Sequence, residues 1–252
     1  MASLQPARRL DVFLVEAGFF DSRARAQAAI AAGEVCVDGV IATRASQKIM
    51  DSQKLSVTSE AQSYVSRGSL KLAHALTYFD ISPDGQSVID LGASTGGFTD
   101  VLLRRGAKTV YAIDVGHDQL HASLQRDARV VNREGVNARS LDQTHIPEPA
   151  DAVVCDVSFI SLRLVVEPAL ALLHAPAWMV LLIKPQFEAG RAALNKKGVV
   201  TDPHIHERVC AEFSDWFAAV APAWKQLGIT PSPITGPEGN HEFLFAARLA
   251  LE

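Results

Sequence analysis

The chain has 252 residues, 48% of them hydrophobic, and a formal net charge of −4 at pH 7. This length fits one large domain or a large domain with a small companion, and the negative charge excludes RNA binding through a global positive field. No segment approaches the roughly 18 apolar residues of a membrane span, no secretory signal opens the chain, and the three cysteines lack metal or redox spacing, so we expect a cytoplasmic protein.

The first part of the chain, residues 1–60, is predicted to be a small α+β domain that begins with two helices. Apolar residues at helical spacing indicate a helix over residues 10–17, which Gly18 would end. Ser22 is suited to cap a second helix, which Gly33 would end.

A small sheet is predicted to follow these helices. The dipeptide Asp38-Gly39 favours a type I′ turn between two short strands, and "KLSVT" (residues 54–58) supplies one more strand. The pattern places four basic residues outside the strands: Arg8, Arg9, Arg44 and Lys48.

The segment "RLDVFLVEAGFFDSRARAQAAIAAGEVCVDG" resembles the RNA-binding module that is named after a ribosomal small-subunit protein and recurs in pseudouridine synthases and tyrosyl-tRNA synthetases. The shared features are its Arg-Leu-Asp start, the Ser-Arg before the second helix and the Gly-x-Val-x-Val-Asp-Gly turn. The resemblance implies that this domain binds RNA, and the alternative is that its arginines are ordinary solvated charges. The candidate RNA contacts here are Arg8, Arg9, Arg23 and Arg25, and Arg67 is a further one in the linker.

Residues 61–68 form a predicted linker, and a helix begins near Ser69. In residues 69–252, strands and helices alternate, and a hairpin closes the chain. This alternation predicts an α/β fold, a doubly wound Rossmann-like sheet with helices on both faces and ligands at the carboxyl ends of the strands. The predicted strands before the hairpin span residues 87–92, 109–114, 129–135, 151–156 and 178–184.

A glycine-rich turn follows the first strand of this domain and differs from the G-x-G-x-x-G of pyrophosphate-binding dehydrogenases. Asp114, 22 residues after Gly92, can accept both hydroxyls of a ribose. Acidic positions tolerate the amino and sulfonium charges of S-adenosylmethionine and would repel a diphosphate, so the turn predicts that cofactor. A purely structural turn and a nicotinamide site are the alternatives. The candidate cofactor-binding residues are Asp90, Gly92, Ala93, Ser94, Gly96, Gly97, Phe98, Asp114 and Asp156.

Candidate catalytic residues stand at other strand ends. Asp156 and Lys184 each end an apolar strand, and a lysine in that position is costly unless it is paired or used. Lys71 and Glu242 are expected to converge on the same crevice. A ribose 2′-hydroxyl is a weak acid that needs a base during methyl transfer, and neutral Lys184 is the candidate base, with the two carboxylates orienting the amines.

Six segments in order resemble the TlyA family of rRNA 2′-O-methyltransferases, whose members also carry the name haemolysin and whose catalytic domain is related to the FtsJ-type enzymes. The segments are "YVSRGSLKL", "DLGASTGGFTDVLL", "CDVSFISL", "LIKPQFEAG", "KKGVV" and "GNHEFL". The resemblance runs nearly end to end and implies cytidine 2′-hydroxyls of ribosomal RNA as substrate and ribosomal subunits as partners. The family's Lys-Asp-Lys-Glu tetrad falls on Lys71, Asp156, Lys184 and Glu242, with Glu238 as the alternative for the last position.

Other chemistries fit less well. The sequence after the fourth strand is Asp156-Val-Ser-Phe, which is not the Asn/Asp-Pro-Pro-Tyr of amino-group methylation. Cys155 and Cys210 lie inside predicted elements and are interpreted as structural thiols. No metal site is predicted, because the pairs His204/His206 and His117/His121, the latter four apart on an expected helix, lack a third ligand.

The loop "PQFEAGRAALNKKGVV" after Lys184 is a candidate RNA-contacting lid through Arg191, Lys196 and Lys197, and a solvated connector is the alternative. Within the family, a longer type acts on both ribosomal subunits and a shorter type on the large one. The short ends of this chain favour large-subunit rRNA as target. A membrane-active haemolysin and an RNA-binding protein with an inactive methyltransferase fold are the remaining alternatives, and the sequence does not predict an oligomeric state.

Overall fold

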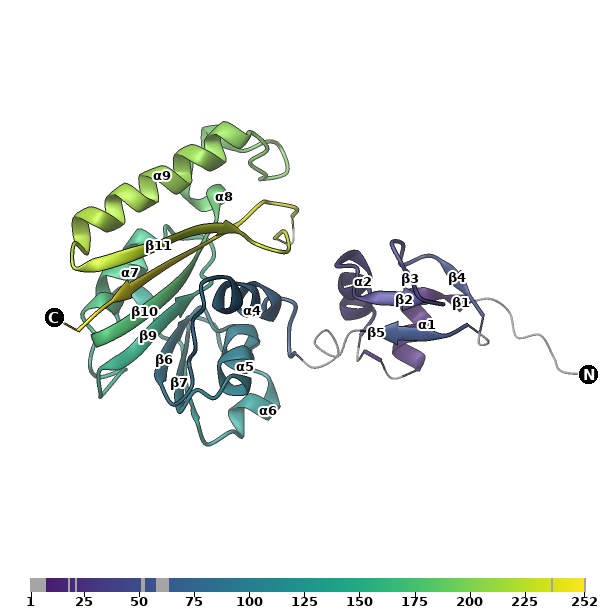
Figure 1. Ribbon diagram of the computed structural model, residues 1–252, viewed down its shortest axis with the longest axis horizontal. Helices are drawn as coiled ribbons and strands as arrows, with labels where there is room; N and C mark the ends of the chain where they lie inside the picture. Colours follow the sequence, from purple (N-terminus) through teal and green to yellow (C-terminus); the bar gives the residue numbers. More distant parts are fainter. Residues whose placement is uncertain are drawn as a thin grey trace, which may run out of the picture. The chain divides into compact units, whose positions relative to one another are not determined.

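A computed structural model describes residues 8–17, 19–20, 22–50, 53–57, 64–236 and 238–251. The chain divides into two compact units, Met1–Arg67 and Gly68–Glu252 (Figure 1). Gly18 and the first residues of the predicted linker, 61–63, lie outside the described residues.

The N-terminal unit contains the two helices and the three-stranded sheet that the sequence predicts. The Ser22 hydroxyl accepts a hydrogen bond from the Arg25 backbone N–H and caps the second helix. Asp38 and Gly39 both have positive φ, 53° and 81°, as a type I′ turn requires. The helices are α1 (Leu10–Glu16) and α2 (Arg23–Ala31), and the sheet joins β3 (Val40–Ile41), β2 (Val35–Val37) and β5 (Leu55–Val57) in that order.

The placement of Arg8, Arg9 and Lys48 outside the strands was wrong. Arg8–Arg9 forms β1, which pairs antiparallel with β4 (Lys48–Ile49), while Arg44 does lie outside the strands. A two-residue ribbon of charged side chains shows no hydrophobic alternation, so no sequence pattern announces it. Apolar residues next to and within the ribbon hold it in place, because Leu10 and Ile49 belong to the apolar core of this unit and are at most 1% exposed.

The larger unit is built on a seven-stranded sheet in the order β11-β12-β10-β9-β6-β7-β8 (Figure 1). Strands β6 to β10 run parallel, and β12 is antiparallel to both of its neighbours. The carboxyl ends of the parallel strands therefore meet at one edge, where a ligand is expected. The strands are β6 (Ser87–Leu91), β7 (Thr109–Asp114), β8 (Val130–Glu134), β9 (Ala150–Cys155), β10 (Leu173–Ile183), β11 (Trp224–Pro231) and β12 (Phe243–Leu249).

Helices cover both faces of this sheet, as predicted. Alternate side chains of the central strands, such as Leu91 and Leu181, form one apolar cluster with Val165 of α7 and Phe213 of α9. The opposite face carries α4 and α5, and the Ser69 hydroxyl of α4 donates to the Gly97 carbonyl of α5. The helices are α4 (Ser69–Tyr78), α5 (Gly97–Arg104), α6 (Ala122–Gln125), α7 (Arg163–Leu170), α8 (Pro185–Glu188) and α9 (Pro203–Val220), with the 3-10 turns η1 (Ala138–Ser140) and η2 (Arg191–Ala193).

Two local expectations differ from this fold. The segment after Lys184 is not a plain loop, because α8 and η2 occupy its first part. His117 and His121 do not share a helix, since His121 is the N-cap of the short α6 and its side chain accepts from the Ser123 N–H.

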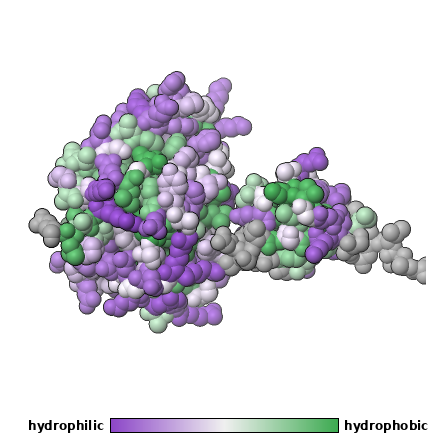
Figure 2. Space-filling view, in the orientation of Figure 1, coloured by the Kyte–Doolittle hydropathy of each residue, from purple (hydrophilic) through white to green (hydrophobic). Residues whose placement is uncertain are grey.

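Among the described residues, no helix is long and apolar enough to cross a membrane. On the face that Figure 2 shows, polar side chains surround separate apolar patches.

Candidate active site

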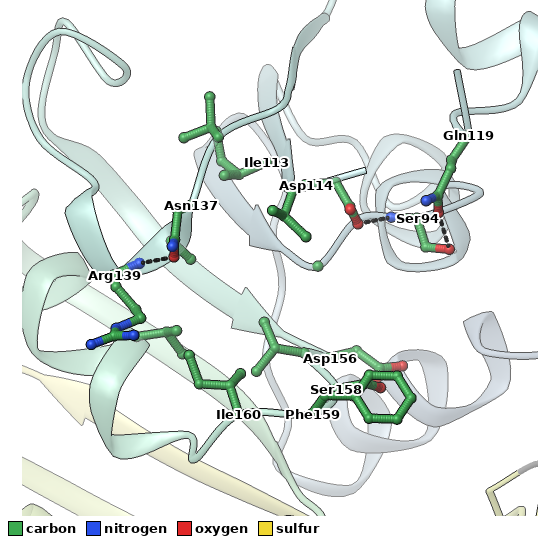
Figure 3. Close-up of a pocket in the computed structure, with 16 residues that line it drawn as sticks. Ser94, Ile113, Asp114, Gln119, Asn137, Arg139, Asp156, Ser158, Phe159 and Ile160 are labelled. Carbon is green, nitrogen blue, oxygen red and sulfur yellow. Dashed lines mark hydrogen bonds between the residues drawn. The ribbon is translucent and has the colours of Figure 1, made fainter. Parts of the chain in front are cut away.

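A cavity of about 550 Å³ opens at the carboxyl edge of the parallel strands. Its wall combines the turn after β6, the end of β7, the segment after β8 and the segment after β9. Figure 3 shows Ser94, Asp114 and Gln119 on one side and Asp156, Ser158 and Phe159 on another. Several strand ends thus contribute polar groups to one apolar-walled space, which is the usual build of a small-molecule site.

The glycine turn brings the backbone close to this cavity. Gly92 has a φ of 79°, and a Cβ on it would lie 2.8 Å from the Asp156 carbonyl oxygen. Gly96 has a φ of 96°, and a Cβ there would lie 2.1 Å from Leu124 Cδ1. Both positions therefore favour glycine for conformation, and at Gly92 the Asp156 backbone also leaves no space for a side chain.

Of the predicted cofactor-binding residues, four line the cavity: Gly92, Ser94, Asp114 and Asp156. The other five, which are Asp90, Ala93, Gly96, Gly97 and Phe98, are not part of its wall. Ala93 and Phe98 are buried, at 5% and 3% exposure, and support the turn from beneath.

Asp114 is held in place by the backbone around it. Its Oδ2 accepts the Ser94 N–H at 2.7 Å, and its Oδ1 accepts the Gly116 N–H at 2.7 Å. A carboxylate oxygen has two lone pairs, so each oxygen keeps acceptor capacity for a ligand hydroxyl. The turn and the end of β7 thus fix one oriented acceptor in the cavity wall.

Asp90 has a different environment. It is fully buried, the Thr99 hydroxyl donates to its Oδ2 at 2.6 Å, and its Oδ1 has no hydrogen-bond partner in the described part of the chain. Burial raises the pKa of Asp90 to about 7, and the nearby charge of Asp156 acts in the same direction. Its side chain supports the turn from the α5 face of the sheet.

The four predicted catalytic residues come together beside the cavity. Lys184 Nζ lies 2.6 Å from Asp156 Oδ1 and donates to the Ser158 hydroxyl at 2.8 Å. Lys71 Nζ lies 3.5 Å from Asp156 Oδ2 and 2.7 Å from Glu242 Oε2. Both lysine side chains are at most 8% exposed, so Asp156 bridges two buried amines and Glu242 pairs with one of them in a continuous cluster.

The geometry separates the two candidate glutamates. Glu242 is 3% exposed and pairs with Lys71, whereas Glu238 is exposed. Gly236 packs against Glu242, since a Cβ on it would lie 2.8 Å from Glu242 Oε1. The cluster therefore includes Glu242 and not Glu238.

The predicted RNA-contacting residues are divided between the N-terminal unit and the larger unit. Arg9 and Arg23 pair with buried Asp11 at 2.9 and 3.0 Å, and Gln27 donates to the same carboxylate at 2.6 Å. The Arg9 guanidinium holds the pKa of Asp11 well below its usual range. The others are Arg8, which pairs with Glu16, Arg25, which donates to the Tyr64 carbonyl, and the exposed Arg67, Arg191, Lys196 and Lys197.

Sequence reasoning missed several residues of the cavity wall. Phe159 lies at the rim of the cavity, is 92% exposed and has a φ of 65°. It stands in the same segment as Asp156, "CDVSFISL", so the sequence could have indicated it. Gln119, Asn137 and Arg139 also line the cavity, and the Asn137 Oδ1 accepts the Arg139 N–H at 3.0 Å (Figure 3). These three follow β7 and β8 without a motif, and only the sheet order brings them to the site.

Thiol chemistry finds little support here. Burial raises the pKa of Cys155 to about 12 and that of Cys210 to about 11, so both thiols are protonated at neutral pH. The described residues contain no group of three or more His, Cys, Asp or Glu side chains that could hold a metal ion.

Comparisons with known proteins agree with this geometry. The model of the FtsJ-like methyltransferase family matches residues 64–249, and that of the S4 domain matches residues 8–55. The chain is 41% identical to the 16S/23S rRNA (cytidine-2′-O)-methyltransferase TlyA of Mycobacterium tuberculosis, across 95% of this chain and 89% of that protein. It is 36% identical to the 23S rRNA (cytidine-2′-O)-methyltransferase TlyA of Campylobacter jejuni, across 78% and 75%. A solved Streptococcus thermophilus structure is 38% identical with a TM-score of 0.73, covering 97% of this chain and 89% of that one.

Proposed function

The chain belongs to the TlyA family of FtsJ-like methyltransferases with an N-terminal S4 domain, and we propose that it methylates cytidine ribose 2′-hydroxyls in ribosomal RNA. Both family resemblances seen in the sequence are confirmed by these matches. The observation that carries the proposal is the cluster of Lys71, Asp156, Lys184 and Glu242 beside the cavity, because a weakly acidic hydroxyl needs a positioned base.

The FtsJ-like methyltransferase fold implies S-adenosylmethionine as cosubstrate. The residues present fit it: the glycine at position 92 leaves room against the Asp156 backbone, and Asp114 offers oriented acceptors for ribose hydroxyls. Asn137 and Gln119 add amide groups for the polar edges of the ligand. When bound, the cofactor supplies an electrophilic methyl group.

The protein's own residues handle the proton. In this proposal Lys184 Nζ is the base, and it accepts the proton that the ribose 2′-hydroxyl loses as its oxygen gains the methyl group. Asp156 and Ser158 fix the direction of that amine, because both contact its nitrogen. Lys71, held by Glu242, places a positive charge beside Asp156 and so balances the carboxylate during the transfer.

The N-terminal unit supplies RNA affinity and no chemistry in this proposal. The S4 match and the exposed side chains of Arg9 and Arg23 support that division. Phosphate contacts are the usual role of such arginines, since a guanidinium binds phosphate through two parallel hydrogen bonds.

Large-subunit rRNA remains the predicted target. The names of the two relatives include this target, either alone or together with small-subunit rRNA. The Campylobacter protein is named for 23S rRNA alone, whereas the Mycobacterium protein is named for 16S and 23S. A 2′-O-methylcytidine found in small-subunit rRNA would defeat this narrower prediction and leave the methyltransferase proposal intact.

The decisive experiment incubates the purified protein with labelled S-adenosylmethionine and each ribosomal subunit from cells that lack the enzyme, followed by mass mapping of the RNA. We expect one 2′-O-methylcytidine per modified subunit. Label on a base rather than a ribose would contradict the proposal, as would red-cell lysis by the cofactor-free protein without any methyl transfer.

A further inference from the structure

The segment that carries Lys196 and Lys197 is a closed turn. The Asn195 carbonyl accepts the Gly198 N–H at 2.9 Å, and the Asn195 Oδ1 accepts the Lys197 and Val199 N–H groups at 2.8 and 3.0 Å. Gly198 has a φ of 74°, which suits glycine. The two exposed lysines occupy the central positions, and within the described residues neither ammonium group has an ion-pair partner.

Two buried side chains anchor this turn to the rest of the unit. Asn240, 3% exposed, accepts the Val200 N–H with Oδ1 at 3.0 Å and donates from Nδ2 to the Gly198 carbonyl at 3.2 Å. From α9, His206 Nε2 lies 3.0 Å from the Val200 carbonyl oxygen. Val200 itself is fully buried, so the base of the turn is fixed from both sides.

The same asparagine is coupled to the catalytic cluster. It lies two residues before Glu242, and its carbonyl accepts the Gly236 N–H at 2.9 Å. Gly236 in turn packs against Glu242, whose other oxygen meets Lys71. The connections α8–α9 and β11–β12 are thereby joined beside the active site, at the same end of the sheet in Figure 1.

We propose that Asn240 is a positioning residue that fixes the Lys196–Lys197 turn next to Glu242, so that both ammonium groups meet RNA phosphates flanking the target nucleotide. A pre-ordered turn loses less conformational freedom when it binds than a free loop does. This inference rests on the proposed function. It also assigns linked roles to "KKGVV" and "GNHEFL", about 40 residues apart: one supplies the charges and the other holds them.

The test is a mutant cycle with three variants: Asn240→Ala, the double variant Lys196→Ala/Lys197→Ala, and their combination. We expect the first two each to raise the KM for ribosomal subunits about fivefold to tenfold and to lower the salt dependence of RNA binding by about one to two units. The combination should be no worse than the lysine double variant, because the anchor acts only through the lysines. Calorimetric affinity for S-adenosylmethionine should not change.

A matched control removes the same charge elsewhere. Lys108→Ala/Lys225→Ala takes two exposed lysines from the opposite edge of the sheet and should leave the KM unchanged. Where Asn240→Ala does not fold, Asn240→Asp keeps the acceptor for the Val200 N–H but sets a carboxylate oxygen against the Gly198 carbonyl, and should also raise the KM.

Two outcomes would overturn the proposal: additive effects of the anchor and the lysines, or a loss of kcat at unchanged KM and salt dependence. The latter would mean that Asn240 acts through Glu242 alone. Failure of the proposed function is a separate result, because the wild type would then methylate no subunit, while equilibrium RNA binding would still report the coupling.

Discussion

In the N-terminal unit, buried Asp11 holds two arginines whose side chains remain 42% and 57% exposed. In the methyltransferase unit, Asp156 and buried Glu242 hold two lysines whose side chains are 8% and 7% exposed. In both units an acidic side chain fixes basic ones, but the arginines of one unit face solvent and the lysines of the other are enclosed beside a cavity. The difference matches what each basic group can do.

A guanidinium stays protonated in proteins, whereas an amine can lose its proton in a suitable site. Exposed arginines of fixed direction suit RNA phosphates, and enclosed lysines suit proton transfer. The two units therefore divide binding from chemistry, and each prediction below tests one side of that division.

The largest effect is expected at Lys184. Lys184→Ala should lower the rate of methyl transfer by about 10²–10⁴-fold, because it removes the base. Lys184→Arg should fail as well, because a guanidinium does not take the proton. Single-turnover transfer from labelled cofactor measures the rate, and calorimetry should show unchanged cofactor affinity. An arginine variant with near-normal turnover would erase the contrast between the units, since both would then use charge alone.

A smaller loss is expected at Asp114, a carboxylate that holds backbone N–H groups and no cation. Asp114→Ala should weaken S-adenosylmethionine binding by about 1–3 kcal/mol, the cost of leaving hydrogen-bonding groups unpaired. Isothermal calorimetry measures it directly, with the exposed neighbour substitution Asp118→Asn as control. Equal affinity in wild type and Asp114→Ala would remove Asp114 from the cofactor site.

Much of this contrast could be predicted from the sequence, where a simple periodicity or rule applies. Burial on both faces makes the parallel strands continuous apolar runs, and polar residues at their ends then meet at one edge. That rule was enough to bring Asp156 and Lys184 together. Strand alternation also bears on Asp90. Leu91 packs on the face covered by α7 and α9, so its neighbour Asp90 points to the other face, toward Thr99 of α5. The prediction that Asp90 contacts the cofactor did not take this alternation into account.

What the sequence missed depends on contacts between distant segments. The pairing of Arg8 with Ile49 spans 41 residues and involves no apolar alternation in the first strand. The cavity positions of Asn137 and Arg139 follow from the neighbouring strands β7 and β8 and from no local motif. The Asn240 anchor is of the same kind, since its partners lie about 40 residues earlier.

On the binding side of the division, loss of exposed arginines should change salt dependence and not chemistry. Arg9→Ala and Arg23→Ala should each flatten the salt dependence of RNA binding by about one unit per lost phosphate contact. The kcat with saturating RNA should stay within about twofold, because general-base catalysis involves other groups. A filter-binding series across salt concentrations provides the slopes. A steep fall in kcat with an unchanged slope would contradict the proposed division of labour.

Both units also contain a buried carboxylate with a shifted pKa, and the two shifts have opposite signs. Measuring thermal stability at different pH values tests this difference, and it is the prediction with the smallest expected effect. Hydrogen bonds from Arg9 hold the pKa of Asp11 low, while burial raises the pKa of Asp90 to about 7. Asp11 therefore contributes stability above its unfolded pKa of about 3.9, and that contribution is lost only as the pH falls through its low folded pKa. Between pH 5 and pH 8 its contribution should be constant.

Asp90 should behave in the opposite way in that window. Its raised folded pKa means that the folded state binds the proton more tightly, so its contribution is fully present below the unfolded pKa of about 3.9 and is lost as the pH rises toward about 7. The melting temperature of the larger unit should thus fall between pH 5 and pH 8 by roughly 2–4 °C per kcal/mol lost. Asp90→Asn should flatten this fall, because the amide does not titrate and the Thr99 hydroxyl can still donate to it. Asp11→Asn is the matched control, and it should shift stability equally at both pH values. Parallel melting profiles of wild type and Asp90→Asn from pH 5 to pH 8 would show that Asp90 is ionised throughout, and the contrast between the two buried acids would then be absent.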